Sequence, residues 1–154
     1  RDRDEESERE EEEEEPLPQV TLNIDLFRRS RRYPRIYAPR FGKPKDEGWW
    51  VVIGDPRRNE LVAVKRINAI RGKTSTKLLF DWDDEMYGEG NDPDNADGYG
   101  FRFYLISDCY MGLDQEYEFV VRHADIPDPP VREDAGPEGP GEGWDPTTGH
   151  GVEE

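Results

Sequence analysis

Three groups of residues in this 154-residue chain have side chains from which a catalytic or ligand-binding site could be built. The first is Arg71-Gly72-Lys73-Thr74-Ser75, which is similar to the end of a phosphate-binding loop, where a Lys and backbone N–H groups hold phosphates. The full pattern needs a glycine five residues before Gly72, but Ile67 stands there, and a strand pattern follows where a helix is required. We therefore predict no nucleotide site and no cofactor in this chain.

The second group is similar to a calcium-binding loop and comprises Asp92, Asp94, Asn95, Asp97 and Gly98. Oxygen ligands suit Ca²⁺, but the spacing is wrong for an EF-hand, and the twelfth position from Asp92 is Phe103 rather than Glu. The segment predicts weak attraction of cations and no specific metal site.

The third group, Ser107, Asp108 and His123, has the residue types of a hydrolase triad. No nucleophile elbow surrounds Ser107, and the one other histidine is His150 in a polar tail. Cys109, the single cysteine, is more typical of a small buried or half-buried residue than of a nucleophile. We predict no active site; a small self-standing enzyme remains an alternative that requires His123 to lie beside Ser107 and Asp108.

Six short segments with strand patterns must position these residues. Apolar and polar side chains alternate along four of them, while one is a short apolar run and another follows that run after a turn. The six are residues 20–26, 49–53, 61–66, 74–80, 101–105 and 116–122. No long window shows a helical stripe. The pattern predicts an all-β, immunoglobulin-like or fibronectin type III sandwich of about six to seven strands. We place a missing first strand upstream of Arg1.

The segment Trp49–Ile53 is apolar on both of its faces. This pattern predicts a central strand that is covered on both sides. If one face is open in the structure, that face marks a docking surface.

Charge divides the chain into three parts. Residues 1–15 and 125–154 each carry a net charge of −8, which together account for the −16 of the whole chain, while residues 16–124 hold seventeen acids and seventeen bases. We predict a disordered acidic segment at 1–16, a sandwich at 17–124 with an exposed acidic insertion at 81–100, and a disordered tail at 125–154.

Composition excludes several classes of protein. No apolar stretch approaches the roughly 18 residues of a membrane span. The acidic N-terminus predicts no secretory signal, and one cysteine allows no internal disulfide. A reducing compartment and no membrane partner are therefore expected.

Basic residues gather in the first half of the sandwich, where residues 28–77 carry a net charge of +11. The densest cluster comprises Arg28, Arg29, Arg31, Arg32 and Arg35. It could bind RNA phosphates or an acidic partner. The interpretation we favour is that these bases neutralise the chain's own acidic segments, including the Glu run.

Two blocks carry a family resemblance. Residues 48–66 contain Gly48, Trp49, Trp50, Gly54, Asp55, Lys65 and Arg66; residues 104–119 contain Asp108, Tyr110, Gly112, Asp114, Gln115 and Tyr117. Together they resemble the last domain of tandem-cassette superfamily-two RNA helicases. That domain is the immunoglobulin-like (fibronectin type III) end of a unit homologous to a translocon protein. The resemblance covers residues 19–122 and is closest to the spliceosomal member, with the cointegrator-complex relative as the alternative and a meiotic relative as a third.

This resemblance implies a non-catalytic module that packs on and stiffens a helicase cassette in the nucleus. Its expected partners are the other domains of the parent helicase and spliceosomal proteins, and RNA contact through the basic cluster is the alternative. ATP and Mg²⁺ would belong to the parent chain, and no catalytic residue carries over. The sequence departs from the family at residues 1–16 and 81–100. The turn Ser107–Gln115 is expected to be structural, since Gly112 permits a left-handed backbone and Asp108 and Asp114 can accept hydrogen bonds from turn amides.

Overall fold

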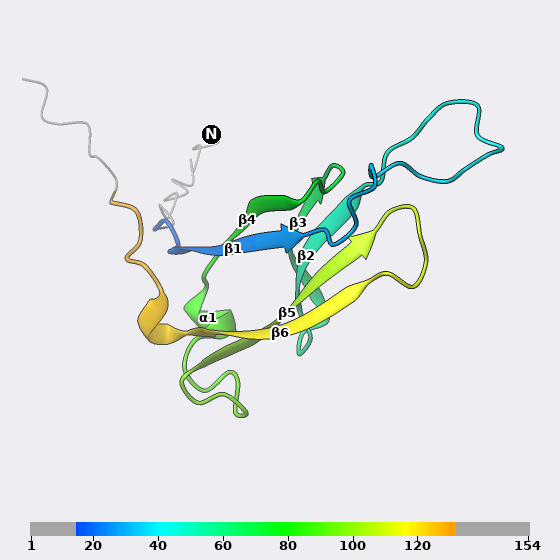
Figure 1. The fold of residues 1–154 in the computed structure, drawn as a ribbon. Coiled ribbons are helices and arrows are strands. Elements are labelled where there is room, and N and C mark those ends of the chain that lie inside the picture. The colour runs from blue at the N-terminus through cyan, green and yellow to red at the C-terminus, as the bar shows by residue number, and fades with distance from the viewer. Residues whose placement is uncertain (1–14, 132–154) are drawn as a thin grey trace, which may run out of the picture.

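A computed structural model describes residues 15–131, and these form two antiparallel sheets packed face to face (Figure 1). All six predicted strands are confirmed. The elements are β1 (Gln19–Phe27), β2 (Trp49–Asp55), β3 (Glu60–Ile67), β4 (Lys73–Asp81), α1 (Asp84–Tyr87), β5 (Gly98–Ser107), β6 (Gln115–Arg122) and a 3-10 turn (His123–Asp125). The prediction of an all-β sandwich is therefore correct.

The two sheets have different sizes. One pairs β1 with β4, and the other has the order β3-β2-β5-β6, so β2 and β5 are its central strands. The register places Ile24 opposite Thr76 in the small sheet and Val51 opposite Leu105 in the large one. Among the described residues no strand pairs with the second edge of β1, which faces β6 across a groove.

The core lies between the sheets, because every second side chain points inward. In β2 these are Trp49, Val51 and Ile53, whereas Trp50 is 38% exposed. The prediction that Trp49–Ile53 is covered on both faces is thus wrong: its outer face is open. The large sheet has no second layer on that side among the described residues (Figure 1).

Residues 81–100 were predicted to form an exposed insertion, but only part of the segment is exposed, because its aromatic residues enter the core. Trp82 and Tyr99 are 1% and 2% exposed, and Tyr87 is buried with them. The rings of Trp82, Tyr87 and Phe101 stack edge-on or tilted, with the Tyr87 centroid 5.1–5.3 Å from the other two. Apolar burial of three widely spaced aromatic rings outweighs the acidic composition of the segment.

The short helix α1 begins where Asp83 caps it, since the Asp83 carboxylate accepts a hydrogen bond of 2.8 Å from the Glu85 N–H. No helix of the described residues has the length and apolar character needed to cross a membrane. The predicted tails fall mostly outside residues 15–131; within the described part, Ile126 packs against the core.

Candidate docking surface

The open side of the large sheet carries a group of apolar side chains, which we call the outer face. Strand alternation and register bring them together: Trp50 lies opposite Ile106, and Val52 lies between Val64 and Tyr104. The outer face comprises Trp50, Val52, Leu61, Val64, Tyr104 and Ile106. Leu61 and Val64 are 64% and 48% exposed. Contiguous exposed apolar groups on a sheet are typical of an interaction surface.

Charged groups frame the outer face. The Arg66 guanidinium lies 6.0 Å from the Trp50 ring centroid, close enough for a cation–π contact. On the β6 side, Arg102 makes ion pairs of 3.0 Å with Glu116 and with Glu118. An apolar centre with a polar rim is the usual anatomy of a protein interface.

Asp108 holds Arg66 in place and is itself held by Gly48, from a distant part of the chain. The Asp108 carboxylate accepts hydrogen bonds of 2.9 Å from the Gly48 N–H and 2.5 Å from Arg66. A Cβ at Gly48 would lie 2.4 Å from both partner side chains, so a larger residue there would displace the Arg66–Asp108 pair. The hydrogen bond from Arg66 lowers the pKa of Asp108, an effect that burial opposes.

The turn after β5 is closed by its own side chains. Asp114 accepts a hydrogen bond of 3.0 Å from the Ser107 N–H, and Ser107 Oγ accepts one of 3.1 Å from the Tyr110 N–H. Gly112 has a φ of +80°, which a glycine adopts without strain. These bonds give the turn a structural role, while the Tyr110 hydroxyl accepts a hydrogen bond of 2.9 Å from the Tyr37 N–H.

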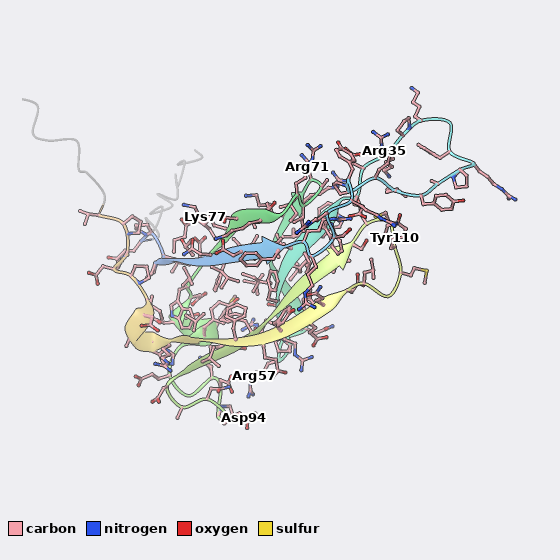
Figure 2. All side chains as sticks on the ribbon, viewed as in Figure 1. Arg35, Arg57, Arg71, Lys77, Asp94 and Tyr110 are labelled. Carbon is pink, nitrogen blue, oxygen red and sulfur yellow. The ribbon has the colours of Figure 1, made fainter. Side chains whose placement is uncertain are left out.

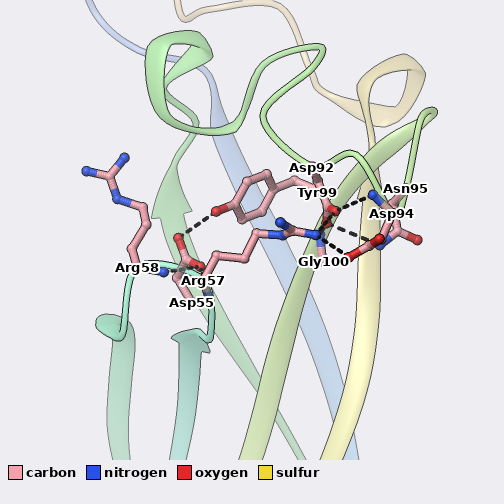
Figure 3. A network of polar contacts seen from close by, with 8 residues as sticks. All are labelled: Asp55, Arg57, Arg58, Asp92, Asp94, Asn95, Tyr99 and Gly100. Atoms are coloured by element: carbon pink, nitrogen blue, oxygen red, sulfur yellow. Dashed lines mark hydrogen bonds and ion pairs between the residues drawn. The ribbon is translucent and has the colours of Figure 1, made fainter.

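A second polar network closes the opposite end of the sandwich (Figure 3). Asp55 is 1% exposed, and it accepts hydrogen bonds from the Arg57 and Arg58 N–H groups and from the Tyr99 hydroxyl, at 3.0, 3.2 and 2.9 Å. Burial and the bond to Asp55 raise the pKa of Tyr99 to about 12. The network thereby fixes the β2–β3 turn against β5.

The segment that is similar to a calcium loop belongs to this network. The Asp92 carboxylate accepts hydrogen bonds from Gly100 N–H at 2.9 Å and Asn95 Nδ2 at 3.1 Å, and it forms an ion pair with Arg57. Burial raises the pKa of Asp92, but the hydrogen bonds from Gly100, Asn95 and Asp94 outweigh it, so the pKa is lowered. Protein donors thus occupy the Asp92 oxygens that a cation would need.

The predicted triad residues are far apart. Ser107 ends β5, whereas His123 follows β6 at the other end of the same hairpin, where Arg122 pairs with Gly98. The ten strand residues from Gly98 to Ser107 span roughly 30 Å. His123 instead packs on Trp82, with ring centroids 5.7 Å apart. The alternative of a self-standing enzyme around Ser107, Asp108 and His123 is therefore wrong.

The other residues named in the sequence analysis lie apart from one another in the fold. Lys73 begins β4 directly after Gly72, whose φ is +64°, so no helix follows the Gly-Lys-Thr segment. Lys65 is exposed on β3, and the Tyr117 hydroxyl donates to Gln115 Oε1 at 2.7 Å. The basic cluster lies in the loop between β1 and β2.

Sequence reasoning missed Arg57 and Tyr99, which complete the network around Asp55 and Asp92. A weak signal existed, because two arginines follow Asp55 in a turn and the neutral residues of the segment 81–100 include three aromatic ones. No sequence pattern gives the pairing between these two segments.

Two antiparallel sheets define a β-sandwich module, and its open apolar face is a candidate docking surface. The chain belongs to the family described as the Sec63 Brl domain, whose model matches residues 11–120. This confirms the resemblance drawn from residues 48–66 and 104–119.

Curated relatives include long helicases. The chain is 37% identical over 102 residues to rat activating signal cointegrator 1 complex subunit 3, which covers 65% of this chain. It is 40% identical over 103 residues to the Arabidopsis thaliana DExH-box ATP-dependent RNA helicase DExH13, and 35% identical over 102 residues to the mouse U5 small nuclear ribonucleoprotein 200 kDa helicase, which cover 67% and 66% of it. The matched segment spans 4% of each relative's length.

Proposed function

We propose that this chain is a non-catalytic sandwich module of an ATP-dependent RNA helicase, which packs against the helicase through its outer face. The observation that carries the proposal is the open apolar face around Trp50 in a family whose curated relatives here are about twenty-five times longer than the matched segment. Exposed apolar groups on a central sheet favour burial against another domain.

Radical footprinting of the longer protein tests this proposal, and neighbouring tryptophans provide the control. Trp49 is 9% exposed and Trp50 is 38% exposed in the sandwich by itself. If the outer face is docked, Trp50 will be oxidised as slowly as Trp49. Oxidation of Trp50 at a rate near that of Tyr37, which is 84% exposed, would show that the face is uncovered and would contradict the proposal.

The proposal extends to the parent protein as a spliceosomal helicase acting in pre-mRNA splicing, with the cointegrator-complex relative as the alternative. The names of the Arabidopsis thaliana and mouse relatives, both of which are called helicases, support a helicase. Subcellular fractionation, followed by detection with an antibody to residues 19–122, separates the two. A band far above 17.9 kDa in the nuclear fraction supports the spliceosomal assignment, and a cytoplasmic one supports the cointegrator relative.

The same proposal expects no ATP turnover from residues 1–154. An ATPase assay with purified chain checks this, with Lys73→Ala as the comparison. Turnover that disappears in this variant would place a nucleotide site in the sandwich and overturn the assignment as a non-catalytic module.

A further inference from the structure

The loop between β1 and β2 extends away from the sandwich as an arm, drawn in cyan in Figure 1. We call residues 28–48 the basic arm. Its two sides are joined by a bridge between Arg35 and Asp46 and by the hydrogen bonds Ile36 N–H to Lys45 O and Glu47 N–H to Pro34 O, each 2.8 Å. Beyond this bridge, the arm is tied to the turn after β5 by the hydrogen bond from the Tyr37 N–H to the Tyr110 hydroxyl. These hydrogen bonds give the arm a defined structure.

The arm has eight basic and two acidic residues, and both acidic side chains interact with residues of the arm itself. Glu47 pairs with Arg28, while Asp46 lies 3.9 Å from Arg35 and accepts a hydrogen bond from Tyr33. The other six bases form no ion pair with residues 15–131: Arg29, Arg31, Arg32, Arg40, Lys43 and Lys45. The arm thus presents a strong uncompensated positive charge.

The acidic segment 81–100 does not neutralise this charge. Its carboxylates Asp92 and Asp94 pair with Arg57, at the end of the sandwich opposite Arg35 and Arg71 (Figure 2). The interpretation that the basic cluster balances the acidic segments is therefore wrong for residues 81–100. The Glu run at 1–14 lies outside the described residues.

Aromatic rings stand among these cations. The Tyr33 ring has the guanidinium carbons of Arg35 and Arg71 at 5.3 and 4.5 Å from its centroid. Farther along the arm, Tyr37 and Phe41 are 84% and 61% exposed. Exposed rings within a basic surface form the usual stacking platform for unpaired bases.

A pocket of about 410 Å³ lies at the base of the arm. Guanidinium-bearing residues dominate its lining, and no carboxylate contributes to it; the lining is Arg28, Ser30, Arg31, Arg32, Tyr33, Pro34, Arg71 and Gly72. Planar guanidinium groups are well suited to bind phosphate oxygens in pairs. Apart from Arg71 and Gly72, the residues that line the pocket belong to the same continuous segment as the exposed rings.

We propose that the basic arm binds single-stranded nucleic acid, with a backbone phosphate in the pocket and bases stacked on Tyr37 and Phe41. Uncompensated charge alone would also suit an acidic peptide. The combination of a carboxylate-free pocket with two exposed rings favours a phosphodiester strand, which supplies both an anion and flat π-faces. This inference is independent of the docking role of the outer face.

Fluorescence anisotropy tests the proposal with the whole 154-residue chain and a labelled 12-nucleotide oligouridine RNA at about 50–200 mM salt. We expect micromolar affinity that falls with salt. The double variant Arg31→Ala/Arg32→Ala removes two phosphate contacts, so the salt slope should drop by about 1.4. The variant Tyr37→Ala/Phe41→Ala should weaken binding at least about fivefold while leaving the slope unchanged. The matched control Lys65→Ala/Arg122→Ala removes two exposed charges elsewhere and should leave the affinity near that of the wild type.

Further experiments separate the alternatives. A variant with residues 10–15 changed from Glu to Gln shows whether the acidic run competes with RNA for the basic arm. If this variant binds RNA and the wild-type chain does not, the site is supported and the acidic run is its competitor. Equal binding of oligothymidine DNA supports a site for single strands in general. The proposal fails if neither protein binds RNA or DNA, or if the arm variants bind as the control does. It also fails if the chain binds an oligoglutamate peptide but no oligonucleotide, which would identify an acidic protein partner.

Discussion

Asp92 is a single buried carboxylate whose two oxygens accept hydrogen bonds from several donors. We expect Asp92→Ala to lower the free energy of unfolding by about 2–3 kcal/mol, because it leaves the Gly100 N–H and Arg57 without their acceptor. The matched variant Asp94→Ala removes a side chain that is 84% exposed and should change it by less than about 0.5 kcal/mol. Urea unfolding of both variants checks the difference. Equal losses would mean that the network in Figure 3 adds nothing beyond surface charge.

Two depressed carboxylate pKa values make stability depend on pH. Asp92 and Asp108 have folded-state pKa values below their ordinary values, so each stabilises the fold fully above the unfolded pKa of about 3.9. That contribution is lost as the pH falls through the folded pKa. We expect the free energy of unfolding to decrease below about pH 4. Asp108→Asn should flatten this decrease in denaturant titrations at several pH values, and an unchanged slope would contradict the assigned role.

Among the elements, four of the six strands were predictable because they alternate apolar and polar side chains, and burial in β1 and β4 follows that period. β2 was predictable as a short apolar run and β3 as the strand that follows it after a turn. The fold of residues 81–100 was not predictable from composition. Its aromatic residues are spaced irregularly, and their positions depend on contacts with Phe101 and the β2–β3 turn.

The candidate surfaces, too, were predictable only in part. The apolar pattern of Trp49–Ile53 indicated a docking face, but the pairing of Arg35 with Asp46 that builds the arm has no sequence signal.

The free edge of β1 gives a prediction for one element. The Arg28 N–H donates to Gly72 O and the Trp82 N–H donates to Pro18 O. The backbone N–H groups of the even-numbered residues of β1 therefore point toward β4. The N–H groups of residues 23, 25 and 27 therefore face the groove of about 730 Å³ between β1 and β6, and those of residues 19 and 21 face a neighbouring pocket of about 390 Å³. We expect these amides to exchange with solvent much faster than those of residues 20, 22, 24 and 26 in NMR exchange of this chain.

The control for this experiment is the longer protein. If the missing first strand lies upstream of Arg1, as the sequence predicts, the odd-numbered amides will become protected there while the even-numbered ones change little. Equal protection of both sets already in the 154-residue chain would show that another segment or a second copy covers the edge.

At the scale of the whole molecule, charge and apolar surface are separated in space. The basic arm extends from one end of the sandwich and the acidic network closes the other, while the apolar outer face lies along the large sheet between them (Figures 1 and 2). This separation allows one surface to pack against a parent helicase while another remains accessible to a charged ligand. Variants of the two surfaces should therefore have additive effects.

The variant Trp50→Thr tests the outer face in the longer protein. Thr keeps the strand preference but removes the largest apolar group, so the isolated chain should lose only about 1 kcal/mol of stability. In the intact helicase, loss of a central aromatic contact should cost about 2 kcal/mol or more, enough to undock the module.

Footprinting of Tyr104 on the same face reports this change: Tyr104 should be slow to oxidise in the wild type and fast in Trp50→Thr. Leu79→Thr is the matched control, since Leu79 is 48% exposed on the other sheet and should leave Tyr104 protected. Protection of Tyr104 in both variants would show that Trp50 is not an anchor of the docked face, and exposure in both would indicate general loosening of the sandwich.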